Sequence, residues 1–210
     1  MADEAKEKLF ADMIWNWYLV GDDQSLPDGF KRFLAVEAAL FRVLPGKPRC
    51  TQCNAPLGGV GLRIIGPVMG IRPSVLSPRL CNGCEQSILK AAGGAQVELS
   101  LLFADIRGST SKAQETSPTE YTKFIQRFYK SASDVLINHN ALVSHLVGDQ
   151  VIGLFVPRFA GADHSKVAIE AALEILKATA HQDKVGPWAP LGVGVHTDVA
   201  YVGAVGPNGE

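Results

Sequence analysis

The sequence lacks an excess of charge of one sign, a secretion signal and a long apolar run. Its 210 residues contain 20 Lys and Arg against 21 Asp and Glu, which gives no sign of a nucleic-acid or membrane partner. The start, MADEAKEKLF, has neither the basic region nor the apolar centre of a signal peptide. The most apolar stretch, residues 58–76, is interrupted by Arg63, Arg72 and two prolines, well short of the ~20 residues of a spanning helix. We therefore expect a cytoplasmic protein.

Cysteine is also scarce, but its four copies form two C-x-x-C pairs, Cys50 with Cys53 and Cys81 with Cys84. In a cytoplasmic protein this spacing favours metal ligation over disulfides. The 27 residues between the pairs, 54–80, match a zinc ribbon, so structural Zn²⁺ is the first choice. A [2Fe–2S] cluster uses the same four thiolates and is the second choice. Four buried free thiols are the least favoured alternative.

The residues before and around the cysteines predict two small regions. Apolar residues at helical spacing indicate helices over 4–20 and 30–44, which form a hairpin or pair with a second copy of the chain. Residues 46–92 are rich in Gly and Pro and carry few strand or helix signals. Such a segment buries too little apolar surface to fold alone, so a bound metal would supply stability. We expect a helical region over 1–45 and a cysteine module over 46–92.

From about residue 96 the sequence alternates between strand and helix patterns. VELSLLFAD predicts a buried strand, and residues 117–139 predict a long helix with Ser117 as N-cap and Glu120 completing a capping box. ALVSHLV and VIGLFVP predict a tight hairpin around GDQ. A second helix over about 160–181 and two further strands, LGVGVHT and AYVGAVG, complete the pattern. This order predicts an α+β domain over 96–210, of the ferredoxin-like split βαβ type, with helices on one face of a mainly antiparallel sheet.

Two acids stand at strand ends in this layout. Asp105 ends the first strand, and Asp149 lies in the hairpin turn. If the first strand lies beside the hairpin, both carboxylates emerge at one edge of the sheet, where a divalent cation would relieve their repulsion. Residues 106–110, IRGST, would follow with backbone N–H groups that can bind phosphate oxygens. Together these features indicate phosphoryl or nucleotidyl transfer.

The segments FADIRGST, VGDQVIGLF and LGVGVHTDVAYVGAVG resemble, in order and spacing, the catalytic domain of class III adenylate/guanylate cyclases. The resemblance implies an enzyme, a phosphorus–oxygen lyase, that converts a nucleoside triphosphate, ATP being favoured, to a 3′,5′-cyclic nucleotide and pyrophosphate in intracellular signalling. It also implies two Mg²⁺ or Mn²⁺ ions and a homodimer with sites at the interface. More loosely, the N-terminal half is similar to a cysteine-bearing segment of some bacterial stand-alone cyclases.

The resemblance also assigns roles to particular residues. Asp105 and Asp149 match the catalytic metal-binding aspartates, and the Ile106 carbonyl matches a further metal ligand. The predicted phosphate-binding residues are Ile106, Arg107, Gly108, Ser109 and Thr110. His145 stands where the family's K-x-x-G-D pattern has a base-contacting lysine. Because a neutral imidazole has a shorter reach than lysine, the base selectivity is left open, and a purely structural role for His145 is equally favoured.

The chain ends at Glu210, before the family's second base-reading residue and its ribose-orienting asparagine and arginine. We therefore expect a truncated chain that is weakly active or inactive, because each missing contact is worth orders of magnitude in rate. A catalytically silent, cyclase-like nucleotide-binding or dimerising regulator is the alternative. A zinc-ribbon nucleic-acid binder is disfavoured because the basic residues are not concentrated as such binding requires.

Overall fold

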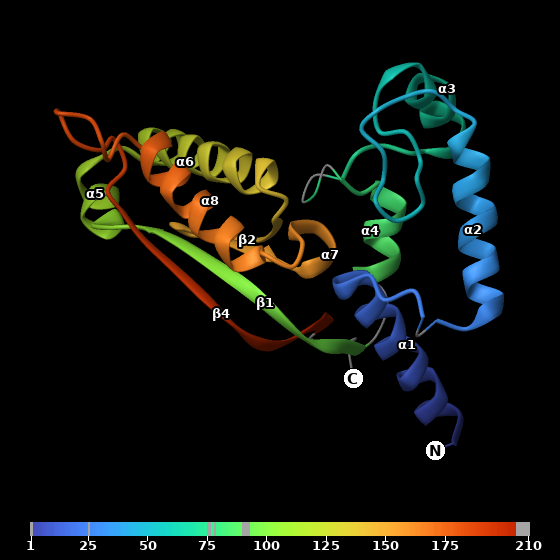
Figure 1. Ribbon diagram of the computed structural model, residues 1–210. Coiled ribbons are helices and arrows are strands. Elements are labelled where there is room, and N and C mark those ends of the chain that lie inside the picture. The colour runs from blue at the N-terminus through green and yellow to red at the C-terminus, as the bar shows by residue number, and fades with distance from the viewer. Residues whose placement is uncertain (1, 25, 75–76, 78, 90–92, 205–210) are drawn as a thin grey trace. The chain divides into compact units, whose positions relative to one another are not determined.

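The computed structural model divides the chain into two compact units, the first formed by residues up to Val97 and from Val199 onward, the second by Glu98–Asp198. Two long strands, β1 (Gly93–Ile106) and β4 (Leu191–Ala204), contribute residues to both units, as Figure 1 shows. The residues that the structure describes are 2–24, 26–74, 77, 79–89 and 93–204. No helix within these ranges is long and apolar enough to cross a bilayer.

The first unit begins with the two helices that the apolar spacing predicts, α1 (Ala2–Val20) and α2 (Asp28–Arg42). Aromatic side chains join them, because the Phe30 ring meets those of Phe10 and Trp17 edge to face, with centroids 5.9 Å and 6.2 Å away. Edge-to-face pairs of this kind stabilise a contact beyond the area that they bury. The two helices therefore contact each other within one copy of the chain, but Figure 1 does not show them antiparallel along their lengths, as the helices of a hairpin would be.

Two helices occur in the cysteine region where the sequence showed few helix signals, α3 (Gly59–Met69) and α4 (Asn82–Leu89). The Gly content of this region is explained in part by close packing. The Gly61 N–H donates to the Pro45 carbonyl at 2.7 Å, and a Cβ at position 61 would lie 2.1 Å from that oxygen. Gly61 therefore allows two backbone segments to touch, which a helix-propensity argument cannot anticipate.

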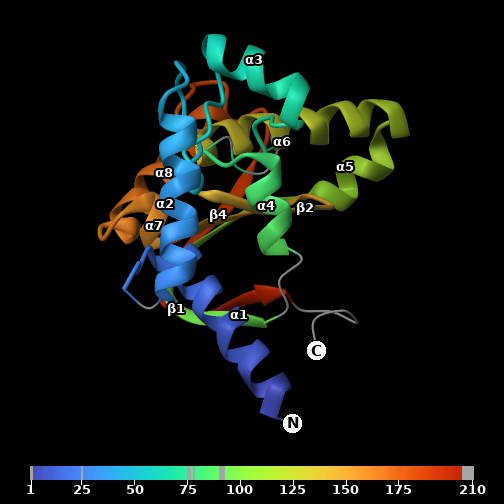
Figure 2. The same ribbon diagram turned by 90° about the vertical axis from the view of Figure 1, so that its right-hand side faces the viewer.

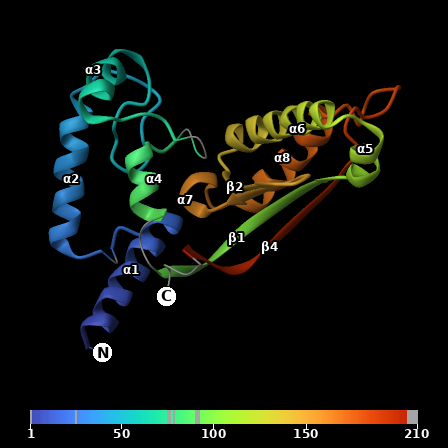
Figure 3. The ribbon, with the colours of Figure 1, turned by 180° about the vertical axis from the view of Figure 1, so that it is seen from behind.

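In the second unit, the described strands form one sheet in the order β2-β3-β1-β4. β2 (Leu142–Val147) and β3 (Gln150–Phe155) form the predicted hairpin, and β3 pairs antiparallel with β1. Helices α6 (Pro118–Asn138) and α8 (His164–Ala178) cover one face of this sheet, as Figure 3 shows. The arrangement agrees with the α+β, split βαβ fold predicted from the sequence.

The core of this unit lies between the sheet and the helices. Alternate residues of β1, Leu102, Ala104 and Ile106, are buried against Phe128 of α6 and Ile175 of α8. The residues between them, Asp105 included, lie on the opposite face and are half-buried. Since strand side chains alternate between faces, the core residues fix on which face Asp105 lies.

Helix ends follow the sequence closely at α6 and less closely at α8. Ser117 and Glu120 form the predicted capping box, in which each side chain bonds the other's backbone N–H. The helix expected over about 160–181 is present as the shorter α8, and a separate short helix, α7 (Pro157–Ala160), precedes it. Gly161, with φ of 82° and ψ of −176°, ends α7, in a backbone conformation that glycine adopts readily.

The prediction of two strands at the C-terminal end was wrong, because residues 191–204 form the single strand β4. The expected break, HTDVA, contains no Gly or Pro to form a turn, and apolar alternation continues through it. Past this point β4 stays beside β1, and Figure 2 shows the two strands running together near α1. Their approach is close, since a Cβ at Gly94 would lie 2.6 Å from the Val202 carbonyl oxygen.

Candidate active site and cysteine cluster

Asp105 and Asp149 are brought together by the register of β1 and β3. Asp105 is paired across the ladder with Gln150, the residue that follows Asp149. The Ile106 N–H donates to the Asp149 carbonyl at 3.1 Å, which joins the end of β1 to the hairpin turn. The two predicted catalytic acids therefore lie at neighbouring strand ends, as the sequence pattern required.

The electrostatics of the pair reflect this proximity. Burial raises the pKa of Asp105, and the negative charge of Asp149 raises it further. Both side chains remain half-buried, so solvent and ions can reach them. Two neighbouring carboxylates with an open approach form a set of oxygen donors that suits Mg²⁺ or Mn²⁺, and a cation there would remove the repulsion that raises the pKa of Asp105.

Ser109, predicted to bind phosphate through its amide, also contacts the acid pair. Its hydroxyl donates a hydrogen bond to Oδ2 of Asp149, and it is nearly buried. It is the first residue of α5 (Ser109–Glu115), after Gly108 with φ of 72°. No local sequence pattern predicts this contact, because Ser109 and Asp149 are forty positions apart. Ser109 therefore links the predicted phosphate-binding turn to one of the acids.

The predicted phosphate-binding amides divide into two groups. Those of Ile106 and Arg107 already donate within the protein, to the carbonyls of Asp149 and Pro190 respectively. Ser109 and Thr110 begin a helix, where backbone N–H groups have no acceptor inside the helix. Any phosphate contact through amides would therefore fall to Gly108, Ser109 and Thr110.

His145 lies in β2, where its backbone pairs with that of Ile152 beside a register shift. Its side chain, the predicted base contact, lies outside the described part of the chain. The base-contacting role stays a prediction.

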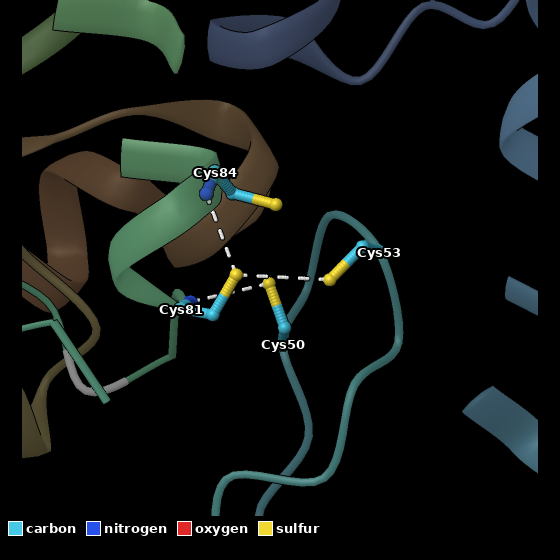
Figure 4. Close-up of side chains that lie close together, drawn as sticks. All are labelled: Cys50, Cys53, Cys81 and Cys84. Atoms are coloured by element: carbon cyan, nitrogen blue, oxygen red, sulfur yellow. Dashed lines mark hydrogen bonds between the residues drawn. The ribbon is translucent and has the colours of Figure 1, made fainter. Parts of the chain in front are cut away.

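The four cysteines form a second cluster, in the first unit. Their sulfur atoms all lie within 4.8 Å of one another, and Figure 4 shows the side chains pointing toward a common centre. Cys53 Sγ and Cys81 Sγ are 3.8 Å apart, which is the spacing of about 3.8 Å set by a tetrahedron with Zn–S bonds of about 2.3 Å. Cys50, Cys53 and Cys81 are buried, and Cys84 is half-buried. These four thiols could hold one metal ion.

Backbone N–H groups also point at these sulfurs. The Cys81 N–H donates to Cys50 Sγ at 3.3 Å and the Cys84 N–H to Cys81 Sγ at 3.4 Å. Hydrogen bonds from Cys53, Cys81 and Cys84 lower the pKa of the Cys50 thiol despite its burial. A thiolate is the form that ligates metal, and N–H···S hydrogen bonds such as these stabilise it.

Sequence reasoning missed the residue that ties this cluster to α2. The Arg49 guanidinium donates to the carbonyls of Phe41, Leu44 and Asn54. The Phe41 carbonyl lies in the last turn of α2, the Leu44 carbonyl lies two residues beyond the end of that helix, and the Asn54 carbonyl lies just after Cys53. An arginine before C-x-x-C carries no sequence signal for this contact.

The comparisons with known proteins agree with the geometry of the second unit. A family model described as the adenylate and guanylate cyclase catalytic domain matches residues 94–209. The match covers more than half of the chain, which therefore belongs to this family, as predicted.

Two curated relatives of the chain are described as adenylate cyclases. An adenylate cyclase of Mycobacterium tuberculosis is 33% identical over 113 residues, which are 52% of this chain and 25% of that protein. An adenylate cyclase of Anabaena cylindrica is 26% identical over 137 residues, 63% of this chain and 26% of that protein. The chain thus spans about a quarter of the length of the curated relatives that it matches.

Among solved structures, the adenylyl cyclase CyaB from P. aeruginosa has a TM-score of 0.43 at 21% identity, over 51% of this chain and 58% of that one. A class III adenylyl cyclase-like ATP-binding protein from Pseudomonas aeruginosa has a TM-score of 0.46 at 19% identity, over 55% of this chain and 27% of that one.

Proposed function

We propose that the protein is a nucleotidyl cyclase that converts a nucleoside triphosphate, ATP being favoured, to a 3′,5′-cyclic nucleotide and pyrophosphate. One observation carries the proposal: in a chain of the cyclase family, Asp105 and Asp149 lie at neighbouring strand ends and interact electrostatically. The ATP preference follows the adenylate cyclases among the relatives. The working form would be a homodimer, as the family resemblance implies.

The two acids, with the Ile106 carbonyl, would hold two Mg²⁺ or Mn²⁺ ions. Ions bound there would lower the pKa of the attacking 3′-hydroxyl and neutralise the charge of the leaving pyrophosphate. The protein's own groups prepare the site. Ser109 orients the Asp149 carboxylate by its hydrogen bond. The amide N–H groups at the start of α5, after the turn at Gly108, would be available to phosphate oxygens.

For the cysteine cluster we propose one structural Zn²⁺ ion. The mutual sulfur distances, all within 4.8 Å, support a single ion at the centre. A [2Fe–2S] cluster binds its cysteine pairs to two separate irons and would need the pairs further apart. The buried sulfurs and N–H···S bonds also fit a closed structural site. Zinc content and the visible absorption spectrum distinguish the two metals, because zinc thiolates are colourless.

The test of the proposed reaction uses the 210-residue chain and the Asp105→Ala variant. Mn²⁺ is titrated in the presence of a non-hydrolysable ATP analogue, and cyclic nucleotide is measured by mass spectrometry after long incubation with ATP. We expect wild-type protein to bind Mn²⁺ and the analogue together. Asp105→Ala should lose the part of the analogue binding that depends on metal. Equal metal-dependent binding by both proteins would refute the proposed site. Cyclic nucleotide formed by wild-type protein and lost in Asp105→Ala would support the cyclase reaction over the silent regulator.

A further inference from the structure

The turn that carries Asp149 also accepts a hydrogen bond from Tyr129, a residue outside the sequence motifs described so far. Tyr129, on α6, donates a hydrogen bond from its phenol to the Gly148 carbonyl at 2.8 Å. Gly148 and Asp149 are the two residues that connect β2 to β3, and Gly148 has φ of 62°. The bond thus joins the helical layer directly to the hairpin turn.

Three hydrogen bonds fix this short turn to three different elements. The Asp149 carbonyl accepts from the end of β1, through the Ile106 N–H, and its carboxylate accepts from Ser109 of α5. Tyr129 of α6 supplies the third. Because metal ligands must hold their positions to within about 0.5 Å, a turn held on only two sides would place the Asp149 carboxylate less accurately relative to Asp105.

The phenol can act only as the donor in this contact, because a carbonyl oxygen has no proton to give. Burial raises the pKa of Tyr129, and Asp149 and Tyr121 make smaller contributions in the same direction. The acceptor is the Gly148 backbone carbonyl and not a carboxylate, so the contact positions the turn without using any lone pair of the Asp149 side chain.

We propose that Tyr129 is a positioning residue for the metal site at Asp105 and Asp149, acting through the Gly148 carbonyl. This proposal rests on the proposed function, since it assigns a role in metal binding at that pair. Removal of the hydroxyl leaves the ring and its packing in place, but lets the turn move away from α6. The consequence is weaker metal binding without loss of the fold.

The test compares Tyr129→Phe with Tyr121→Phe in the zinc-loaded, 210-residue chain. Tyr121 lies about two turns earlier on α6, and its ring packs on Phe124, so the control removes the same atom from the same helix. Mn²⁺ binding is followed by the electron paramagnetic resonance signal of the free ion. Binding to Asp105→Ala measures the Mn²⁺ held at other sites, and this background is subtracted. Thermal unfolding and amide hydrogen exchange at residues 148–150 report on the fold and the turn.

We expect Tyr129→Phe to raise the Mn²⁺ dissociation constant about three- to tenfold, as for the loss of one hydrogen bond, with faster exchange at the turn and a melting temperature lowered by no more than about 4 °C. Tyr121→Phe should change the constant less than about twofold. Wild-type affinity in Tyr129→Phe, or equal losses in both tyrosine variants, overturns the positioning role while the proposed function stands. If wild-type protein binds Mn²⁺ no better than Asp105→Ala, the proposed function itself fails, and this role fails with it.

Discussion

The chain holds two candidate metal sites of opposite design, the cysteine cluster of the first unit and the acid pair of the second. The cluster brings four soft sulfur ligands together, three of them buried. The pair offers two hard carboxylates that are half-buried and lie at neighbouring strand ends. Structural metal sites use a complete set of protein ligands, whereas catalytic sites leave positions for substrate and water. The difference supports the proposed division of roles, stability for the cysteine cluster and chemistry for the acid pair.

The strongest test of this contrast is removal of one sulfur ligand. We predict that Cys81→Ser loses the bound zinc and much of the helical signal of the first unit, because structural zinc contributes on the order of 10 kcal/mol to folding in small modules. Zinc content by atomic emission and helix content by circular dichroism measure the effect. Asp105→Ala is the control and should keep its full zinc content. Loss of zinc without loss of helix would mean that the cluster is not structural.

A medium-sized effect is expected at Arg49, which connects the cluster to α2 through three carbonyls. We predict that Arg49→Ala lowers the free energy of unfolding by about 2 kcal/mol, the value of about one hydrogen bond to a charged group, because water can replace part of the three bonds at this half-buried side chain. Urea denaturation at constant zinc concentration measures this change.

Arg42→Ala is the matched control, because Arg42 is an exposed arginine at the end of the same helix. Arg49→Lys should recover only part of the loss, since an ammonium group cannot reproduce the planar fork of a guanidinium. Equal stability of Arg49→Ala and Arg42→Ala would show that the first unit does not depend on this link.

The ligands of both candidate sites could be predicted from the sequence, but the residues that support those ligands could not. The C-x-x-C pairs and the two aspartates are local patterns, and the alternating strands placed Asp105 and Asp149 correctly because side chains alternate along a strand. Contacts between distant residues left no pattern. Ser109 with Asp149, Tyr129 with Gly148 and Arg49 with the end of α2 all depend on tertiary packing. Helix α3 was missed for a similar reason, since its glycines serve close packing.

The smallest predicted effect concerns how far the acid pair destabilises the folded protein when no metal is bound. The pKa of Asp105 is raised in the folded protein, so the folded state holds this proton more tightly than the unfolded state. Stability contributed by the group is therefore present at low pH and is lost as pH rises from the ordinary value of 3.8 through the raised value. Asp105→Asn, which cannot ionise, removes this dependence.

We therefore predict that metal-free Asp105→Asn is more stable than wild type at pH 7 by about 0.5 kcal/mol, a small figure because solvent screens the pair, and that the difference vanishes near pH 3. Urea unfolding across this pH range, with chelator present, measures it. Added Mn²⁺ should reverse the order, because only the wild-type pair gains a bound cation and the stability that accompanies ligand binding. If Asp105→Asn is less stable than wild type in chelator, protein groups alone stabilise the charged Asp105 carboxylate. The acid pair would then need no cation, and its contrast with the cysteine cluster would be lost.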